Sequence, residues 1–171
     1  MTAQKIVTIA AAARIADAAR RKGKKVITTN GCFDIIHVGH VRNLQAARKL
    51  GDLLMVGINS DASVRQNKGA LRPIVPARER AEVLAALACV DYVFIFSGKS
   101  PIPWMRKIRP SVHVKGKGSE RSPAFAAEKS AVEEGGGKVF LAPQTAKRST
   151  TAIIETVVRR YKGSSGQAPR R

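Results

Sequence analysis

Two histidines three residues apart, His37 and His40, are the side chains of this sequence best suited to chemistry. At the start of a helix they would share one face, because residues three apart are neighbours on a helix surface. An imidazole N–H donates to a phosphate oxygen, and its pKa lets the charge of the ring adjust near neutral pH. Gly39 between them would let a triphosphate approach the backbone closely. The pattern indicates a phosphate site, and a pair of surface or capping histidines is the plainer alternative.

The segment 26–45 contains the elements that must position these histidines. Residues 26–29 form a short β-branched run typical of a strand, and Asn30-Gly31 is a dipeptide that tolerates positive φ in a turn. Apolar residues at helical spacing follow from Val41 onward. A strand that leads through such a turn into a helix directs backbone N–H groups and the positive end of the helix dipole at one point. We therefore predict an anion site at this junction.

Helices and strands alternate along the rest of the chain. Helices are predicted at about 8–22, 38–50, 61–67, 77–90, 101–108, 124–134 and 149–161, and strands at 26–29, 52–58, 92–96, 112–115 and 138–141. This order predicts a Rossmann-like three-layer α/β/α sandwich with a parallel five-stranded sheet. Ligands bind such sheets at the carboxyl ends of the strands, so the loops after the strands are the candidate site. We expect one domain over residues 1–162 and a disordered basic tail over 163–171.

The length and composition fit one soluble globular domain. The chain has 171 residues, of which 44% are hydrophobic and 25% charged. No apolar run approaches the roughly 18 residues that a membrane helix needs, so we expect a cytoplasmic protein without a membrane partner. The two cysteines, Cys32 and Cys89, have no metal-ligand spacing, and a zinc site is not expected.

The formal net charge of +19 is the unusual property of the chain. Nucleic acid is the obvious partner of such a protein, and a basic surface in an enzyme of anionic substrates is the alternative. The positive charge is spread along the sequence, with no block of five or six consecutive lysines and arginines. Aromatic residues make up only 5%, too few for an obvious base-stacking surface. Nucleic-acid binding is therefore disfavoured as the main function.

The run TTNGCFDIIHVGHVRNLQAARKLGD resembles the HxGH nucleotidyltransferases of the cytidylyltransferase-like family, and similar segments continue over about residues 24–155. Within that family the chain most resembles the D-glycero-β-D-manno-heptose 1-phosphate adenylyltransferase domain of ADP-heptose synthesis. Glycerol-3-phosphate cytidylyltransferase is a more distant relative with the same framework.

The resemblance implies transfer of AMP from ATP to a sugar 1-phosphate, with release of pyrophosphate, to give an ADP-sugar for lipopolysaccharide core precursor synthesis. Such enzymes mainly position groups and neutralise charge while the acceptor phosphate attacks in line. Mg²⁺ bound with ATP, a separate sugar kinase, and a homodimer with Trp104 and nearby apolar residues at its interface are also implied. A CTP-dependent cytidylyltransferase acting on glycerol 3-phosphate or another polyol phosphate is the alternative. A non-catalytic nucleotide- or nucleic-acid-binding module is the alternative of another class.

The resemblance also implies roles for individual residues. The implied catalytic residues are His37, His40, Lys68 and Arg80. The implied nucleotide-binding residues are Thr29, Asn30, Gly31, Phe33, Asp34, His37, Gly39, His40, Lys115, Gly116, Arg148, Ser149, Thr150 and Thr151. The implied acceptor-binding residues are Asp34, Lys68, Arg72 and Lys117. No protein side chain is expected to bind a metal.

The chain departs from the family pattern at one position. After a Val-Lys-Gly segment, which is Val114 to Gly116 here, the family usually has an acidic residue. This sequence lacks that acidic residue and has Lys117 directly after the segment, two positions before Ser119. The opposite charge predicts an acceptor more anionic than the usual one.

Overall fold

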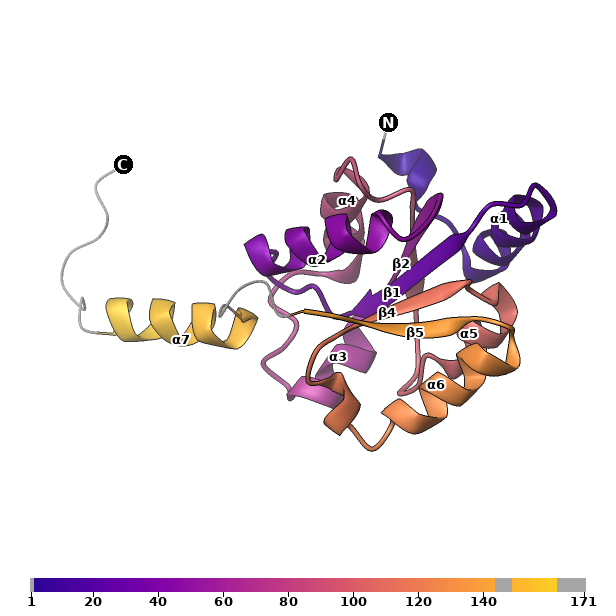
Figure 1. Ribbon diagram of the computed structural model, residues 1–171. Helices are drawn as coiled ribbons and strands as arrows, with labels where there is room; N and C mark the ends of the chain where they lie inside the picture. Colours follow the sequence, from indigo (N-terminus) through magenta and orange to yellow (C-terminus); the bar gives the residue numbers. More distant parts are fainter. Residues whose placement is uncertain (1, 144–148, 163–171) are drawn as a thin grey trace.

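One parallel sheet forms the centre of the molecule (Figure 1). The computed structural model describes residues 2–143 and 149–162, and in this part of the chain the sheet has five strands in the order β3-β2-β1-β4-β5. The strands are β1 (Val26–Gly31), β2 (Leu53–Asn59), β3 (Tyr92–Phe96), β4 (Val112–Gly116) and β5 (Lys138–Ala142). All neighbouring strands pair in parallel, so the predicted fold class is confirmed. The strand order reverses between β1 and β4, which is where such sheets bind ligands.

Helices cover both faces of the sheet (Figure 1). Helices α1 (Ile9–Arg21), α5 (Ile102–Ile108) and α6 (Phe125–Glu134) pack on one face. Helices α2 (Val38–Arg48) and α4 (Ala77–Ala85) pack on the other, and the short α3 (Asp61–Lys68) follows β2. Helix α7 (Thr150–Tyr161) follows β5 and extends away from the sheet. Two short 3₁₀ turns, η1 (Ala3–Lys5) and η2 (Ser119–Arg121), complete the described elements.

Strand β2 shows why the central strands are apolar throughout. Leu54, Val56 and Ile58 are buried in the cluster formed with α2 and α4, whereas Met55 is buried in the cluster formed with α1 and α5. Successive side chains of a strand point to opposite faces, so a strand covered on both sides has no polar face. The continuous apolar run predicted as a buried strand is confirmed.

The predicted elements agree with the structure to within a few residues, except at one helix end. The helix after Pro76 was predicted to continue to Val90, but α4 ends at Ala85. Single-turn bonds follow instead, from the Leu87 N–H to the Leu84 carbonyl and from the Val90 N–H to the Leu87 carbonyl. Val90 is fully buried, because the chain turns inward here to enter β3.

Core packing and a subunit interface are the two roles that the sequence leaves open for Trp104, and the structure shows core packing. The side chain is 2% exposed and lies in the core between α5 and the sheet. Its ring meets Phe94 edge-on at a centroid distance of 5.0 Å. Gly57 on β2 leaves room for this pair, since a Cβ there would lie 2.9 Å from the Phe94 ring. Trp104 is therefore a core residue, and its side chain is not available to a second subunit.

Two further predictions can be placed against the structure. The predicted tail, 163–171, lies outside the described residues. Among the helices that the structure describes, none is long and apolar enough to cross a membrane.

Candidate functional site

A cavity of about 530 Å³ opens at the carboxyl ends of β1, β2 and β4. Its size is in the range of small-molecule and cofactor sites, about 300–1,000 Å³. The ends of these strands, the first turns of α2 and α7 and the end of α3 form its wall. A smaller recess of about 140 Å³ adjoins it, lined by the end of β1, α2 and the ends of β4 and β5.

Most of the predicted site residues line this cavity. Those at its wall are Asn30, Gly31, Phe33, Asp34, His37, Gly39, His40, Lys68, Arg72, Lys115, Gly116, Lys117, Ser149, Thr150 and Thr151. Thr29 lines the smaller recess instead, and its hydroxyl donates to the Val114 carbonyl at 2.9 Å. Arg148 lies outside the described residues. Arg80 lines neither the cavity nor the smaller recess.

The two histidines lie against each other at the start of α2. Their ring centroids are 3.8 Å apart and their planes differ by 23°. His37 is the N-cap of the helix, and its Nδ1 accepts the Gly39 N–H at 3.2 Å. Because Nδ1 acts as an acceptor, the neutral His37 ring carries its proton on Nε2. The residue thus both caps the helix and presents an N–H donor at the cavity wall.

His40 is the more buried histidine of the pair. Burial, and secondarily the neighbouring charge of His37, lowers the pKa of His40 to about 4. Its Nδ1 is buried and has no hydrogen-bond partner among the described residues. At neutral pH the ring is therefore an uncharged imidazole, which can donate one hydrogen bond without placing a positive charge beside His37.

The turn between β1 and α2 holds the His40 ring in place. Phe33 has a left-handed backbone, with φ 48°, although it is not a glycine. Its ring lies 5.2 Å from that of His40. A Cβ on Gly31 would come within 3.1 Å of the same Phe33 ring, so any larger residue there would have to displace that ring by a few tenths of an ångström. Backbone strain of this kind persists where the surroundings enforce it, as they often do at functional sites.

Asp34 organises the loop that follows α3. One carboxylate oxygen accepts the backbone N–H groups of Ile74 and Val75, at 2.8 and 2.9 Å, and the other pairs with Arg72. Burial alone would raise the pKa of the Asp34 carboxyl, but these bonds outweigh it and hold the pKa below its usual value. Both oxygens are therefore occupied by the loop that carries Arg72 to the cavity.

Arg80 lies beneath the cavity and is 1% exposed. Its guanidinium donates to the carbonyl oxygens of Val75 (2.8 Å), Asn59 (2.9 Å) and Cys32, and pairs with the Asp61 carboxylate at 2.7 Å. These acceptors come from the turn after β1, the end of β2 and the segment before α4. The arginine thus ties the elements of the cavity floor together, and direct contact with a phosphate stays a prediction.

Two lysines bring charge to the cavity from the end of β4. The Lys115 ammonium lies 2.6 Å from the Glu128 carboxylate of α6, with only 17% and 10% of the two side chains exposed. Lys117 follows at the wall, and its backbone N–H donates to the Ala142 carbonyl at 2.8 Å. Lys68, at the end of α3, adds a third ammonium group. The cavity is strongly basic and suits an anionic ligand.

The first turn of α7 closes the cavity from another side. Ser149 is its N-cap, and the hydroxyl accepts the Ala152 N–H at 3.1 Å. The Thr150 hydroxyl donates to the Ile35 carbonyl at 3.3 Å, which fastens the helix start to the loop before α2. The N-termini of α2 and α7 therefore border the same space, and each contributes positive dipole potential and backbone N–H groups.

Three residues at the wall were not among the predicted ones, namely Cys32, Asn43 and Asn59. Asn43 could have been found, because it lies three residues after His40 on the same helix. Asn59 ends β2, and its amide donates to the Ser63 hydroxyl at 3.0 Å. Burial raises the pKa of the Cys32 thiol, which favours its protonated, unreactive form. Within the described residues no three His, Cys, Asp or Glu side chains gather as metal ligands.

One protein-family model matches most of this chain. The cytidylyltransferase-like family model matches residues 28–156, which contain the cavity-lining strands and both helix starts. The bifunctional protein HldE of Syntrophotalea carbinolica is 50% identical over 142 residues, 83% of this chain and 29% of the relative. The bifunctional protein HldE of Geobacter metallireducens is 46% identical over 157 residues, 92% of this chain and 32% of the relative. The chain thus spans just under a third of the length of these relatives.

Two solved structures share the fold. The lipopolysaccharide core biosynthesis protein of Thermoplasma volcanium is similar over 74% of this chain and 100% of its own, with a TM-score of 0.61 and 25% identity. The pantoate-beta-alanine ligase of Francisella tularensis is similar over 85% of this chain and 68% of its own, with a TM-score of 0.59. At 17% identity the ligase supports the fold alone.

Proposed function

This chain belongs to the cytidylyltransferase-like family, and on that premise we propose that it transfers AMP from ATP to a sugar 1-phosphate and releases pyrophosphate. The acceptor that we propose is a heptose 1-phosphate, and the product an ADP-heptose for lipopolysaccharide core synthesis. The relatives named bifunctional protein HldE and the neighbour named lipopolysaccharide core biosynthesis protein support this choice.

The arrangement of helix starts carries the proposal. The first turns of α2 and α7 border one cavity at the carboxyl ends of the strands, with His37 and His40 on one and Ser149 to Thr151 on the other. A triphosphate has several anionic groups spread over a few ångströms, so it needs donors from more than one direction. Lys68, Lys115 and Lys117 supply positive charge at the same wall.

The proposed reaction is an in-line displacement at phosphorus. An oxygen of the acceptor phosphate forms a bond to the α-phosphorus of ATP, and the bond from that phosphorus to the bridging oxygen of pyrophosphate breaks. The pyrophosphate leaves with the electron pair of that bond. His37 and His40 donate to oxygens of the triphosphate, and Lys68 and Lys115 offset the charge that develops on the leaving group. The rigid cavity wall aligns the two substrates.

Mg²⁺ is part of the proposal as the partner of ATP. It prefers oxygen ligands and is commonly bound through substrate phosphates with few carboxylates. Asp34 is the carboxylate at the cavity wall, and both of its oxygens hold the loop that carries Arg72. The residues present therefore fit an ion held mainly by the phosphates of the nucleotide, where it would neutralise their charge.

The cellular setting follows from the substrates that we propose. A sugar kinase outside the residues of this sequence supplies the 1-phosphate. The cytoplasm is the proposed compartment, because ATP is the donor. We also propose that the chain acts as a homodimer.

A pyrophosphate-release assay with purified chain tests the function. ATP and CTP are each combined with heptose 1-phosphate, other sugar 1-phosphates and glycerol 3-phosphate. We expect turnover with ATP and heptose 1-phosphate, and loss of at least about 10²-fold in His37→Ala. Lys24→Ala, a change at an exposed lysine away from the cavity, is the matched control. Turnover only with CTP and glycerol 3-phosphate would favour the cytidylyltransferase alternative, and no turnover with any pair would favour a binding module.

A further inference from the structure

Basic side chains gather at the edge of the sheet opposite the cavity. The segment 20–25, RRKGKK, ends α1 and leads into β1, and five of its six residues are cations. The cavity opens at the carboxyl ends of the strands, whereas this segment lies at the amino end of β1. Figure 1 shows α1 and the start of β1 at the end of the molecule away from α7. The charge of this segment therefore lies outside the cavity.

Other segments add cations to the same edge, and we call the exposed ones the basal cluster. Its members are Arg21, Lys22, Lys24, Lys25, Lys107 and Lys138. The first four lead into β1, Lys107 is near the end of α5 before β4, and Lys138 begins β5. Strands β1, β4 and β5 are consecutive in the sheet, so their amino ends lie side by side. Adjacent strands are about 4.8 Å apart, so the cluster extends over about 10 Å of the edge.

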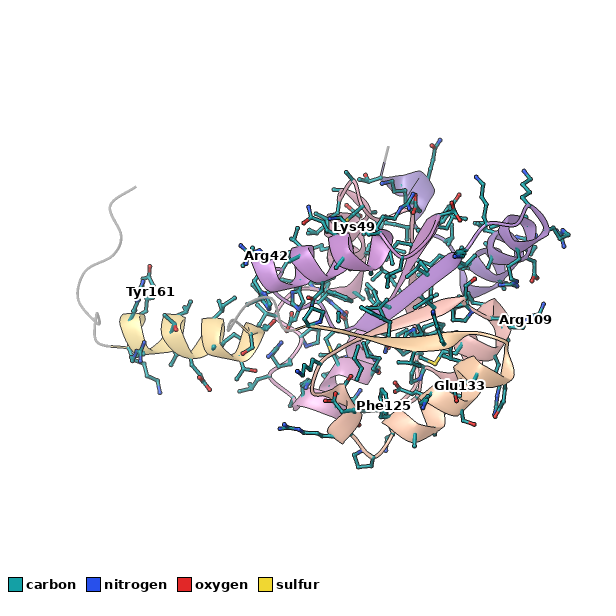
Figure 2. All side chains as sticks on the ribbon, viewed as in Figure 1. Arg42, Lys49, Arg109, Phe125, Glu133 and Tyr161 are labelled. Atoms are coloured by element: carbon teal, nitrogen blue, oxygen red, sulfur yellow. The ribbon has the colours of Figure 1, made fainter. Side chains whose placement is uncertain are left out.

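Hydrogen bonds between the segments fix the positions of these cations. The Arg20 guanidinium donates to the carbonyl oxygens of Ile108 (2.6 Å) and Arg109 (2.8 Å), which ties the end of α1 to the end of α5. The Lys138 N–H donates to the Ser111 carbonyl at 3.1 Å, directly before β4. Figure 2 shows Arg109 at this end of the molecule, far from Tyr161. The backbone that carries the cluster is therefore ordered before any ligand binds, which lowers the entropic cost of binding.

The carboxylates near the cluster leave its charge largely uncompensated. The ion pairs at this edge are Arg20–Asp17, Arg109–Asp17, Arg106–Glu134 and Lys129–Glu133. The Asp52 carboxylate accepts the Lys25 N–H at 2.7 Å and offsets one charge. Within the described residues, no member of the basal cluster forms an ion pair. The edge therefore carries an excess of positive charge that is available to an external anion.

We propose that the basal cluster binds the phosphate backbone of double-stranded nucleic acid without regard to sequence. This property is separate from the proposed function, because the two sites lie at opposite edges of the sheet. A duplex carries about one negative charge per 1.7 Å of its axis, so about 10 Å of edge faces about six phosphates. Lysine and arginine donate to phosphate oxygens, and the counterions released from the duplex supply the affinity.

The surroundings of the cluster favour a duplex over a membrane or a single strand. In the described part of the chain, the large exposed apolar side chains lie at the start of α2, in the loop after α3, on α4 and α7, and in the second halves of β3 and β5. Basic surfaces that lie on membranes usually have apolar anchors beside their cations. Single-stranded bases need aromatic side chains on which to stack. The backbone of a duplex requires neither.

Fluorescence anisotropy of the full chain with a labelled duplex of about 20 base pairs tests this binding. We expect the logarithm of the association constant to fall with the logarithm of the salt concentration, with a slope of about −4 to −5 for about five neutralised phosphates. Two duplexes of unrelated sequence should bind equally. Saturating ATP should not displace the duplex, because ATP occupies the opposite edge of the sheet.

A triple variant, Lys22→Gln with Lys24→Gln and Lys25→Gln, locates the site. It should weaken binding by at least about tenfold at about 0.1 M salt and make the slope shallower by about 3. Its pyrophosphate release should equal that of the wild type, since none of the three lysines lines the cavity.

The matched control removes the same charge elsewhere, with Arg65→Gln, Arg78→Gln and Lys99→Gln at exposed positions outside the basal cluster and the cavity wall. It should bind the duplex nearly as the wild type does. Equal losses in the two triple variants would overturn the proposal, because the net charge of the whole chain would then be responsible. Displacement of the duplex by ATP would overturn it in favour of the cavity. Binding to vesicles of anionic lipid but not to the duplex would overturn it in favour of a membrane surface.

Discussion

The Lys115 ammonium lies 2.6 Å from the Glu128 carboxylate, and the pair joins the end of β4 to the first turn of α6. The lysine lines the cavity, whereas the glutamate lies behind it and is not part of the wall. A short, poorly exposed ion pair restricts a flexible lysine to one geometry. Glu128 is therefore a positioning residue for the cation that faces the ligand.

Glu128→Gln is predicted to raise the KM for the nucleotide by about tenfold while changing kcat little, because the ammonium remains but is no longer held in place. Steady-state kinetics on both substrates measures this split. Glu128→Asp should raise this KM less than Glu128→Gln does, because aspartate keeps the negative charge that holds the ammonium. The control is Glu133→Gln on the same helix, since Glu133 pairs with Lys129 at a half-exposed position (Figure 2). An equal fall in kcat and kcat/KM in Glu128→Gln would contradict the positioning role.

The two tasks of His37 can be separated by substitution. His37→Asn should keep the helix stable, since asparagine is among the best N-cap residues, and should still lower kcat by about 10²–10³-fold because the ring donor is gone. His37→Ala should lower kcat to the same extent and should also lower the free energy of unfolding by about 1 kcal/mol, because alanine cannot cap the helix. Urea unfolding and pyrophosphate release measure the two effects. If His37→Asn retained the wild-type rate, the ring would act only as a cap.

Arg80 is predicted to act on stability rather than on the reaction directly. Arg80→Met removes the partner of the Asp61 carboxylate and of carbonyl groups on three segments, so it should destabilise the fold by about 3–5 kcal/mol. Arg78→Ala is the control two residues away, because the Arg78 side chain is 90% exposed and should change stability by less than about 0.5 kcal/mol. Urea denaturation compares the two. A folded, fully stable Arg80→Met with no activity would instead support direct contact with substrate.

Residues 26–40 show what sequence patterns could establish. Strand propensity, the Asn30-Gly31 turn and the helix start each depend on residues that are adjacent in the sequence. The sequence pattern therefore predicted this strand–turn–helix junction and an anion site at it. Five parallel strands then brought the remaining strand ends to the same edge, and the predicted residues Lys68, Lys115 and Ser149 arrived there with them.

Arg80, Trp104 and α7 show what those patterns could not establish. An arginine on a helix is usually solvated, and nothing local shows that this one meets the carbonyl groups of Cys32 and Asn59, which are far from it in the sequence. The burial of Trp104 depends on Gly57 of another strand. The exposure of the apolar residues of α7 could not be predicted from their helical spacing, because a helix packed on the sheet would have the same spacing. Each of these properties is set by contacts between segments far apart in the sequence.

Lys117 is predicted to set the preference for the acceptor. Lys117→Asp exchanges a cation for an anion at the cavity wall. The kcat/KM for a more anionic acceptor should therefore fall about tenfold further than the kcat/KM for a less anionic one. Competition between a sugar 1-phosphate and a bisphosphorylated analogue measures that ratio directly. The KM for ATP is the internal control. Equal losses for both acceptors would remove Lys117 from the specificity of the site.

The buried His113 predicts how stability depends on pH. Its ring is fully buried and its Nδ1 lies 2.8 Å from the Thr28 hydroxyl, and burial lowers the pKa of His113 to about 3. The unfolded chain binds a proton there below about pH 6.5, whereas the folded chain does so only near pH 3. Stability from this group is therefore complete above pH 6.5 and falls as the pH drops, by about 1.4 kcal/mol per pH unit.

His113→Gln isolates this contribution, because glutamine keeps a hydrogen-bonding group for Thr28 and does not titrate. Urea unfolding of both proteins at pH 7, 6 and 5 should show a shallower decline for the variant, by about 1.4 kcal/mol between pH 6 and pH 5. His40, whose pKa is lowered to about 4, should add a similar slope between pH 6 and pH 5, so the variant should still lose stability as the pH falls. Parallel declines for wild type and variant would mean that the folded protein protonates His113 as readily as the unfolded chain, and that the ring is accessible to solvent at acidic pH.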